Sequence, residues 1–440
     1  MEQYVQMKNS GVSWIQDIPV SWGVRVLFQL ADQVKNKNKD LAEKNLLSLS
    51  YGKIKRKNID SPEGLLPESF DGYNIIEADD IVLRLTDLQN DHTSLRVGQA
   101  KERGIITSAY TTLRPSGLIN PKYLYYVLHA YDLIKGFYGM GSGVRQGLNY
   151  DEVKTIKIPY PPLSEQNRIV TYLENQVAQI DSIIDEAKGS IEDYGAWRKA
   201  VVSESVTKGL HPDVPMKETG ISWLGEIPSN WHFVKITRLL DYNHPYPIGD
   251  GDHGLVKPSD YLDSGIPYIR VQNVGWGTEI TLDNVVYISE ETNTRIVNST
   301  LRPNDILFAK TGATIGKTGI MPNSIPIANT TSHVGKITIS ANYNPKYALY
   351  VLSSKIGFNQ FWEAAGKKTT RPELSIDEIK AIKVLLPPTK TEQNEIVEFL
   401  DQKIAEIDSM VVEKQDVIAD LEAYKRSLIY DAVTGKQKVV

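Results

Sequence analysis

"LNYDEVKTIKIPYPPLSEQNRIVTYLENQVAQIDSII", residues 148–184, has a second copy further along the same chain. Residues 374–411 read "LSIDEIKAIKVLLPPTKTEQNEIVEFLDQKIAEIDSMV". The two copies align from end to end with a single inserted residue near Thr389. A repeat of this length and order predicts that two parts of the chain fold alike.

Two shorter motifs repeat in the same order. "SGVSWIQDIPVSW" from Ser10 matches "TGISWLGEIPSNW" from Thr219, and "NPKYLYYVL" from Asn120 matches "NPKYALYVL" from Asn344. The segments between these motifs, about 30–115 and 240–340, show no evident likeness. Each half therefore begins with a shared segment, called the opening, continues with a divergent segment, called the middle, and ends with a shared segment, called the close. Two large repeats, rather than three or more short ones, favour a pseudo-two-fold over a solenoid.

The shared close predicts a long helix in each half, because its apolar residues recur every three or four positions, as in coiled coils. Pro162 and Pro388 prevent an earlier helical start, and Gly209 and Gly435 suit the ends. About 44 residues make a rod of roughly 65 Å. The residues expected to pack these helices are Ile169, Leu173, Val177, Ile180 and Ile184 in the first and Ile396, Leu400, Ile404, Ile407 and Val411 in the second.

The middles predict mixed β structure with short helices. "ADDIVLRLT" and "PNDILFAKT" are typical of strands, whereas "PKYLYYVLHAYDLI" is typical of a helix. We therefore expect an α+β protein with two mixed α/β domains, separated by two long antiparallel coiled-coil-like helices and related by a pseudo-two-fold. The expected boundaries are 1–160 and 210–386 for the domains and 161–209 and 387–440 for the helices.

Composition sets broad limits on function. The 440 residues are 41% hydrophobic and 23% charged, as in ordinary globular proteins. With no cysteine there are no disulfides and no thiolate metal sites. No signal peptide and no run of membrane-spanning length is evident, so a cytoplasmic location is expected. A net charge of -5 argues weakly against a free nucleic-acid binder but leaves room for a local basic face.

The stretch "AKTGATIGKTG", residues 309–319, looks like a phosphate loop. However, Thr311 stands where the first glycine of that motif belongs. Pro322 and Pro326 follow, so no helix N-terminus is expected to hold a phosphate. We therefore expect a polar turn with another use for Lys310 and Lys317.

The order of these motifs resembles the specificity (S) subunit of Type I restriction-modification enzymes over nearly the whole chain. The resemblance rests on the twofold repeat, on the openings around Trp14 and Trp223, and on "DDIVLRL" and "NDILFAKTGATIGKTG". It rests above all on the closes "PPLSEQNRIVTYL" and "PPTKTEQNEIVEFL". No single motif is decisive, but their order and duplication are specific.

The resemblance implies that 1–160 and 210–386 are target-recognition domains, each reading half of a bipartite DNA sequence. It implies that the helices set the spacing and dock two methyltransferase (M) subunits, and that restriction (R) subunits join through the complex. The chain would catalyse nothing and bind no cofactor. S-adenosylmethionine, ATP and Mg would belong to the partner subunits.

Double-stranded DNA demands Lys and Arg for phosphates, and Arg, Gln and Asn for base edges. Basic residues stand just before the equivalent Leu148 and Leu374 in both halves, which favours DNA contact there. Elsewhere a solvated loop or an exposed sheet face explains the same residues equally well. In "YIRVQNV" the β-branched and aromatic residues favour a strand, on which the alternate residues Arg270 and Gln272 would point together. The candidates are Lys53, Lys55, Arg56, Lys57, Arg145, Gln146, Arg270, Gln272, Asn273, Lys310, Lys317, Lys367, Lys368 and Arg371.

Repeated residues also have structural interpretations. Since Trp14, Trp22, Trp223 and Trp231 recur in otherwise different halves, we expect them in the core rather than stacked on bases. Glu165, Gln166, Glu392 and Gln393 suit the helix N-termini, where carboxylates meet the helix dipole, although contact with methyltransferases is an alternative.

An enzyme, either a nuclease or an ATPase, and a coiled-coil scaffold without DNA contact are the alternative functions. "DEVK" at Asp151 and "DEIK" at Asp377 hold only half of a nuclease motif and fit helix caps. A metal bound near His244 and His253 stays open, although a loop is favoured.

Overall fold

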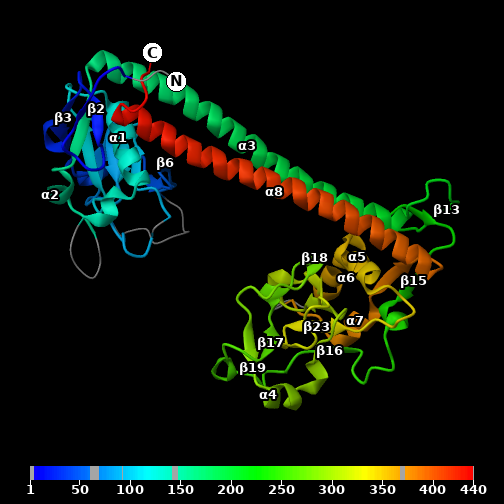
Figure 1. Cartoon of the computed structure of the whole chain (residues 1–440). Coiled ribbons are helices and arrows are strands. Elements are labelled where there is room, and N and C mark those ends of the chain that lie inside the picture. The colour runs from blue at the N-terminus through cyan, green and yellow to red at the C-terminus, as the bar shows by residue number, and fades with distance from the viewer. Residues whose placement is uncertain (1–3, 60–68, 92, 141–146, 367–371, 440) are drawn as a thin grey trace. The chain divides into compact units, whose positions relative to one another are not determined.

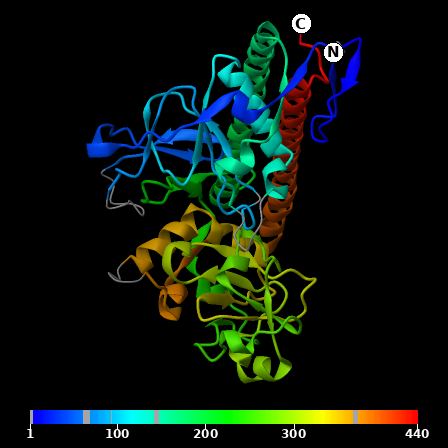
Figure 2. The same ribbon diagram turned by 90° about the vertical axis from the view of Figure 1, so that its left-hand side faces the viewer.

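The computed structural model describes residues 4–59, 69–91, 93–140, 147–366 and 372–439. They form two compact units (Figure 1). Residues 1–188 with 414–440 make unit 1, and residues 189–413 make unit 2. Two long helices, α3 (Leu163–Lys208) and α8 (Lys390–Thr434), each contribute one half to each unit. Both chain ends belong to unit 1 and lie near the start of α3 (Figures 1 and 2).

Unit 1 is built on an antiparallel four-stranded sheet with the order β4-β11-β8-β9. The helices α1 and α2 precede the last strand, β12, which pairs with β3. The pairs β1-β2, β5-β6 and β10-β7 are also antiparallel. The bounds are β1 Met7–Asn9, β2 Asp17–Pro19, β3 Gly23–Val26, β4 Ala31–Gln33, β5 Leu47–Ser50, β6 Lys53–Arg56, β7 Asn74–Ile76, β8 Ile81–Leu83, β9 Val97–Gln99, β10 Gly104–Ile106, β11 Thr111–Pro115, α1 Pro121–Leu133, α2 Tyr150–Val153 and β12 Lys157–Tyr160.

Unit 2 follows the same plan. Its main sheet has the order β16-β23-β20-β21-β18, a smaller sheet has the order β19-β17-β22, and β13-β14 and β15-β24 form pairs. The bounds are β13 Met216–Glu218, β14 Glu226–Pro228, β15 His232–Lys235, β16 Ile248–Asp250, β17 Ile266–Ile269, β18 Trp276–Glu279, β19 Val286–Ile288, α4 Glu290–Arg295, β20 Ile306–Ala309, β21 Thr318–Ile320, β22 Asn329–Thr330, β23 Val334–Ile337, α5 Pro345–Ser353, α6 Lys355–Ala365, α7 Ile376–Ala381 and β24 Lys383–Leu386.

The divergent middles share a core that the sequence did not reveal. In unit 1, β8 pairs antiparallel with β11 on one side and β9 on the other; in unit 2, β20 pairs in the same way with β23 and β21. A buried aspartate precedes each central strand and closes the same turn. Asp80 accepts a hydrogen bond from the Glu77 amide at 2.8 Å, and Asp305 accepts one from the Arg302 amide at 2.9 Å. The two middles are therefore structural repeats with different loops.

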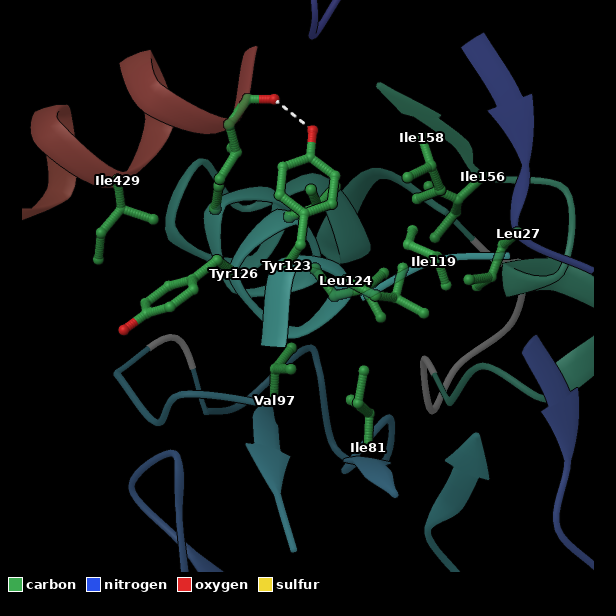
Figure 3. Packing of buried hydrophobic residues seen from close by; sticks show 14 of the residues in the cluster. Leu27, Ile81, Val97, Ile119, Tyr123, Leu124, Tyr126, Ile156, Ile158 and Ile429 are labelled. Atoms are coloured by element: carbon green, nitrogen blue, oxygen red, sulfur yellow. Dashed lines mark hydrogen bonds between the residues drawn. The ribbon is translucent and has the colours of Figure 1, made fainter. Parts of the chain in front are cut away.

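The long helices pack within each unit in the antiparallel sense. In unit 1, the early part of α3 and the late part of α8 join one core with α1 and the sheet. Figure 3 shows Leu124 of α1, Ile429 of α8 and Ile81 of β8 in this core. Tyr123 of α1 donates a hydrogen bond to the Val433 carbonyl at 3.1 Å, which ties that helix to the end of α8. The buried seam in unit 1 includes Ile169, Leu173, Ile180 and Ile184 with Leu428, Ile429, Ala432 and Val433, and the seam in unit 2 includes Ile396, Val397, Leu400, Val202 and Val206.

The predicted seam residues behave as expected. Val177 and Ile404 are half-buried against these two cores, Ile407 is buried, and Val411 is half-buried. Gly209 and Gly435 adopt φ of +72° and +73°, the left-handed conformation that ends helices. α3 continues without a break to Lys208.

The repeated tryptophans divide into two classes. Trp22 and Trp231 are fully buried, which confirms the expectation of a core role. A Cβ on Gly435 or Gly209 would lie 3.2 Å from their indole rings, so these glycines also provide room for the tryptophans. Trp14 is half-buried against Tyr131, with ring centroids 5.2 Å apart. Trp223 is 39% exposed, so a core role for it is wrong.

The polar residues at the two helix starts hold each unit together. Gln166 and Gln393 are buried, and their side-chain oxygens accept hydrogen bonds from the amides of Asn120 at 2.8 Å and Asn344 at 2.9 Å. These asparagines cap α1 and α5. The preceding carboxylates are also engaged: Glu165 accepts from the Tyr4 hydroxyl, and Glu392 accepts from the Trp231 indole nitrogen at 2.9 Å.

Burial of His129 on α1 predicts a pH-dependent stability. Burial, with a smaller contribution from the Lys425 ammonium group, lowers the pKa of His129 to about 4. The unfolded state therefore binds the extra proton between about pH 6.5 and pH 4. The contribution of His129 to the free energy of unfolding is fully present above pH 6.5. It is lost as the pH falls toward 4, by about 1.4 kcal/mol per pH unit at most. Urea unfolding at several pH values measures the slope.

The control for this prediction is His129→Gln, which should remove the His129 contribution to the slope in that window. Burial raises the pKa of Asp132, on the same helix, to about 6, and this group contributes with the opposite sign. The comparison is therefore the difference between parent and variant at each pH. Equal slopes for the two proteins would contradict the prediction.

Candidate nucleic-acid interface

The β5-β6 hairpin of unit 1 has one apolar face and one basic face. Cross-strand partners share a face, and the pairs Leu49–Ile54 and Ser50–Lys53 alternate along the ladder. The side chains of Leu47 and Leu49 in β5 and of Ile54 in β6 pack into a small core beneath the hairpin. The opposite face, called the lysine face below, carries Ser48, Ser50, Lys53, Lys55 and Lys57.

All three lysines of the lysine face are exposed. The Lys57 amide continues the pairing by donating to the Leu46 carbonyl at 2.8 Å, so Lys57 keeps the alternation of Lys53 and Lys55. At about 3.3 Å per strand residue, the alternate positions 53, 55 and 57 lie roughly 7 Å apart, which is close to the separation of successive phosphates along a DNA strand. This geometry suits contact with a DNA backbone.

The tip of the hairpin carries an aromatic residue that sequence reasoning missed. Tyr51 is 73% exposed and has a φ of +47°, and Gly52 follows with a φ of +75°. A Cβ on Gly52 would lie 3.0 Å from the Leu95 side chain, so glycine is needed both for the turn and for close packing. The tight turn therefore presents a tyrosine beside the row of lysines.

Arg56 differs from the neighbouring lysines because it lies on the other face. Its Nε donates to Glu102 Oε1 at 2.6 Å, and its Nη2 contacts the second oxygen of the same carboxylate. This hydrogen-bonded pairing lowers the pKa of Glu102. Arg56 therefore lies apart from the lysines, with its guanidinium group paired to Glu102, and its contact with DNA stays a prediction.

The glycine-rich turn of unit 2 is a connection between two antiparallel strands. β20 ends at Ala309, a single turn of 3-10 helix covers Gly312–Thr314, and β21 begins at Thr318. A strand follows the turn instead of a helix, which confirms that this is not a phosphate loop.

Lys310 does not point to solvent. It is buried and forms an ion pair with Asp250 of β16, so it is removed from the candidates for phosphate contact. Lys317 is half-buried at the end of the turn. It remains a candidate.

Arg270 and Gln272 do not lie on a strand as predicted. β17 ends at Ile269, and Val271–Asn273 form a turn of 3-10 helix. Asn273 is buried and donates to the carbonyls of Thr281 and Asp283 at 3.1 Å, so it is structural. Arg270 and Gln272 do converge, because both donate to the Asn284 carbonyl, at 2.8 and 3.3 Å.

The basic segments predicted at equivalent positions in the two halves lie outside the described residues. These residues are Arg145, Gln146, Lys367, Lys368 and Arg371. The residues that follow them do occupy equivalent positions. The Leu148 amide donates to the Leu85 carbonyl at 2.8 Å, and the Leu374 amide donates to the Lys310 carbonyl at 2.9 Å. Both acceptors follow the central strand of their own sheet.

The candidate catalytic motifs are helix caps. Asn149 and Glu152 form a capping box at α2, and Ser375 and Glu378 form one at α7. The lysines of these motifs pair with the aspartates three residues earlier, Asp151 at 2.5 Å and Asp377 at 3.1 Å.

The loop with the two histidines is held by protein contacts. His244 accepts a hydrogen bond from the Tyr246 amide at 3.0 Å, and Asp252 accepts one from the Val256 amide at 2.7 Å. Across the described ranges, no three His, Cys, Asp or Glu residues are grouped so as to hold a metal ion. Within the same ranges, no helix has the length and apolar character needed to cross a bilayer.

The chain has two α+β units that share an architecture and differ in their loops, and unit 1 carries a basic hairpin. These features are typical of modular nucleic-acid-recognition proteins. Comparison with known families identifies the particular family. The chain belongs to the family described as Type I restriction modification DNA specificity domain, whose model matches residues 27–192 and 228–419.

Relatives and solved structures agree with this family. The chain is 25% identical to the Type I restriction enzyme MjaVIII specificity subunit of Methanocaldococcus jannaschii, over 77% of this chain and 75% of that protein. It is 27% identical to the EcoBI specificity subunit of Escherichia coli, over 63% of this chain and 58% of that protein. A solved structure of a type I restriction-modification system has a chain with the same fold, with a TM-score of 0.68 at 16% identity, covering 96% of this chain and 99% of that one.

Proposed function

We propose that this chain is the DNA-specificity subunit of a type I restriction-modification system and that each unit reads one half of a bipartite target. The observation that carries the proposal is the doubled frame: two units share a core, a helix pair and caps, yet differ in the loops that leave the sheets. Specificity resides in such loops when a rigid scaffold positions them. The lysine face supplies non-specific phosphate contact in the first unit.

In this proposal the chain catalyses nothing itself. Methylation comes from two M subunits, cleavage from R subunits, and S-adenosylmethionine, ATP and Mg are bound by those partners rather than by this chain. A cytoplasmic location goes with this function, since the target is cellular or invading DNA. A nuclease or ATPase is disfavoured by the capping role of the "DEVK" and "DEIK" motifs and by the strand that follows the glycine-rich turn.

The long helices carry a repeated aromatic position that suits docking of identical M subunits. Trp197 on α3 and Tyr424 on α8 occupy equivalent places in the repeat and are 41% and 42% exposed. Two basic residues follow each of them, Arg198 and Lys199 in one helix and Lys425 and Arg426 in the other. Exposed aromatics next to cations are typical of binding hot spots.

We expect Trp197→Ala to weaken M-subunit binding at one site by about tenfold or more, and Tyr424→Ala to do the same at the other. Analytical ultracentrifugation of the chain with purified M subunit measures stoichiometry and affinity. Val412→Ala, at an exposed apolar residue of α8 whose equivalent in α3 is Asp185, is the control. Unchanged assembly by the double variant would remove these residues from the docking surface.

The spacing role of the helices is tested by a matched deletion. Removing residues 182–188 and 409–415 together takes seven residues from each helix at equivalent places and keeps the heptad register. The helices shorten by about 10 Å, which corresponds to roughly three base pairs. Binding selections in the presence of M subunit should return the same two half-sites with a gap shorter by that amount.

Two results would contradict these proposals. A gap of unchanged length in the deletion variant would contradict the spacing role of the helices. If the parent chain with M subunit bound no DNA sequence in preference to others, the proposed function would be wrong. ATP turnover by the pure parent chain would instead support the enzymatic alternative.

A further inference from the structure

Unit 2 contains a cavity of about 710 Å³ between α3, the α5–α6 junction and β18. Such a volume lies within the range of small-molecule sites. One wall is aromatic: Trp276 of β18 and Phe358 of α6 have ring centroids 6.3 Å apart and planes inclined by 47°. Trp276 is 54% exposed, so much of its indole surface is available to a ligand.

The polar groups around this cavity are cationic or neutral. Arg198 and Lys199 come from α3, and Lys355 is the first residue of α6. The Arg198 guanidinium lies 3.3 Å from Asp408 Oδ1, and the Lys355 ammonium lies 5.4 Å from the Trp223 ring, so both side chains are held in place by neighbours. Among the described residues that line the cavity there is no carboxylate. The site therefore favours an anion.

The shared frame does not require this cavity, because the equivalent place in unit 1 is filled. His129 stands where unit 2 has Ser353, and Tyr131 stands where unit 2 has Lys355. His129 is buried and stacks on Tyr125 with ring centroids 5.6 Å apart, and Tyr131 packs on Phe137 at 5.0 Å. Unit 2 replaces this aromatic filling with a serine and a lysine, which leaves a hollow.

Backbone contacts keep the hollow open. Gly277 of β18 has a φ of +76°, and a Cβ there would lie 2.7 Å from the Ser353 hydroxyl. Ser354 accepts a hydrogen bond from the Ile356 amide at 3.2 Å and so starts α6 at the cavity edge. Small residues on facing elements therefore fix the distance between the aromatic wall and the cations.

We propose that this cavity binds a nucleotide, with the base stacked on Trp276 and the phosphate among Lys199, Lys355 and Arg198. Base–aromatic stacking tolerates any base, since every base has a π face. Guanidinium and ammonium groups are the side chains that bind phosphate. A free mononucleotide and an unpaired nucleotide of single-stranded DNA share this chemistry. The proposal does not depend on the proposed recognition of duplex DNA.

Isothermal titration calorimetry of the full chain tests the site with three probes: AMP, adenosine and a ten-residue oligo(dA). We expect AMP to bind at one site per chain and adenosine to bind at least about tenfold more weakly, because it lacks the phosphate. Trp276→Ala should weaken AMP binding about tenfold or more, as loss of a stacking platform does. Lys199→Gln should weaken it by a similar factor, and Trp276→Phe should restore most of the affinity.

Arg426→Gln is the matched control, since Arg426 is the equivalent of Lys199 in unit 1, and it should leave AMP affinity unchanged. Ser353→His, which introduces the residue of the filled repeat, should abolish binding while circular dichroism confirms folding. Binding of oligo(dA) but not AMP, with the same dependence on Trp276 and Lys199, would identify single-stranded DNA as the source. Failure of both probes to bind at millimolar concentration, or binding unaffected by Trp276→Ala and Lys199→Gln, would overturn the proposal.

Discussion

Trp231→Ala is expected to lower the free energy of unfolding of unit 2 by about 3–5 kcal/mol, the range for removal of a large aromatic side chain from a core. Trp231 is fully buried and joins α3, α5 and the start of α8 in one cluster. Its ring lies 6.5 Å from that of Tyr347, and its indole nitrogen donates to Glu392. The substitution leaves a cavity and also an unpaired carboxylate. Urea unfolding followed by circular dichroism measures the loss.

The control comes from the same repeated motif. Trp223 lies in the same opening motif but is 39% exposed, and its ring contacts the Lys355 ammonium group rather than a core. Trp223→Ala should therefore cost less than about 1 kcal/mol. Similar losses for the two variants would contradict the division of the tryptophans into buried and surface classes.

Replacing Lys53, Lys55 and Lys57 together with glutamine is expected to give the largest loss of DNA affinity. If each lysine neutralises one phosphate, the slope of log affinity against log salt falls by about 3 in magnitude. At ~0.1 M salt this corresponds to a 10²–10³-fold weaker complex. The loss should be nearly the same for specific and non-specific duplexes, because phosphate contacts carry no sequence information. Fluorescence anisotropy across a salt series, with M subunit present, gives the slope.

Arg56→Gln is the control within the same hairpin. Arg56 has the same charge and lies between two of these lysines, yet it pairs with Glu102 on the opposite face. Its replacement should change the salt slope by much less than 1. A slope that is unaltered in the triple variant would remove the lysine face from the interface, whereas a large effect of Arg56→Gln would show that the Glu102 pair opens on binding.

Short-range patterns accounted for the elements that the sequence predicted well. The helical seam of Ile169 and Ile396, the glycine ends and the helix caps at "DEVK" and "DEIK" all depend on residues within one or two turns of each other. A repeat strengthens such inferences, because the same pattern must be satisfied twice. The core role of Trp22 and Trp231 was also predicted correctly, but the same argument failed for Trp223, which is 39% exposed.

Side-chain environments set by distant residues could not be predicted. Lys310 meets Asp250 across 60 residues, and Arg56 meets Glu102 across 46, so no local pattern showed that either cation is engaged. Arg270 and Gln272 were placed on a strand because β-branched neighbours favour one, but the chain turns after Ile269. The common core of the two middles was hidden for a related reason, because many apolar sequences fit the same antiparallel ladder.

The sequence by itself determined that this protein is a duplicated α+β chain with two long helices, because repeats, periodicity and turn residues are local properties. Only the tertiary structure decided which basic groups are free to meet a phosphate, which tryptophans are core, and where unit 2 keeps a cavity that unit 1 fills. These outcomes depend on burial and on charge pairing between segments far apart in the chain. Such contacts form only when the fold brings distant segments together, so they cannot be predicted from neighbouring residues in the sequence.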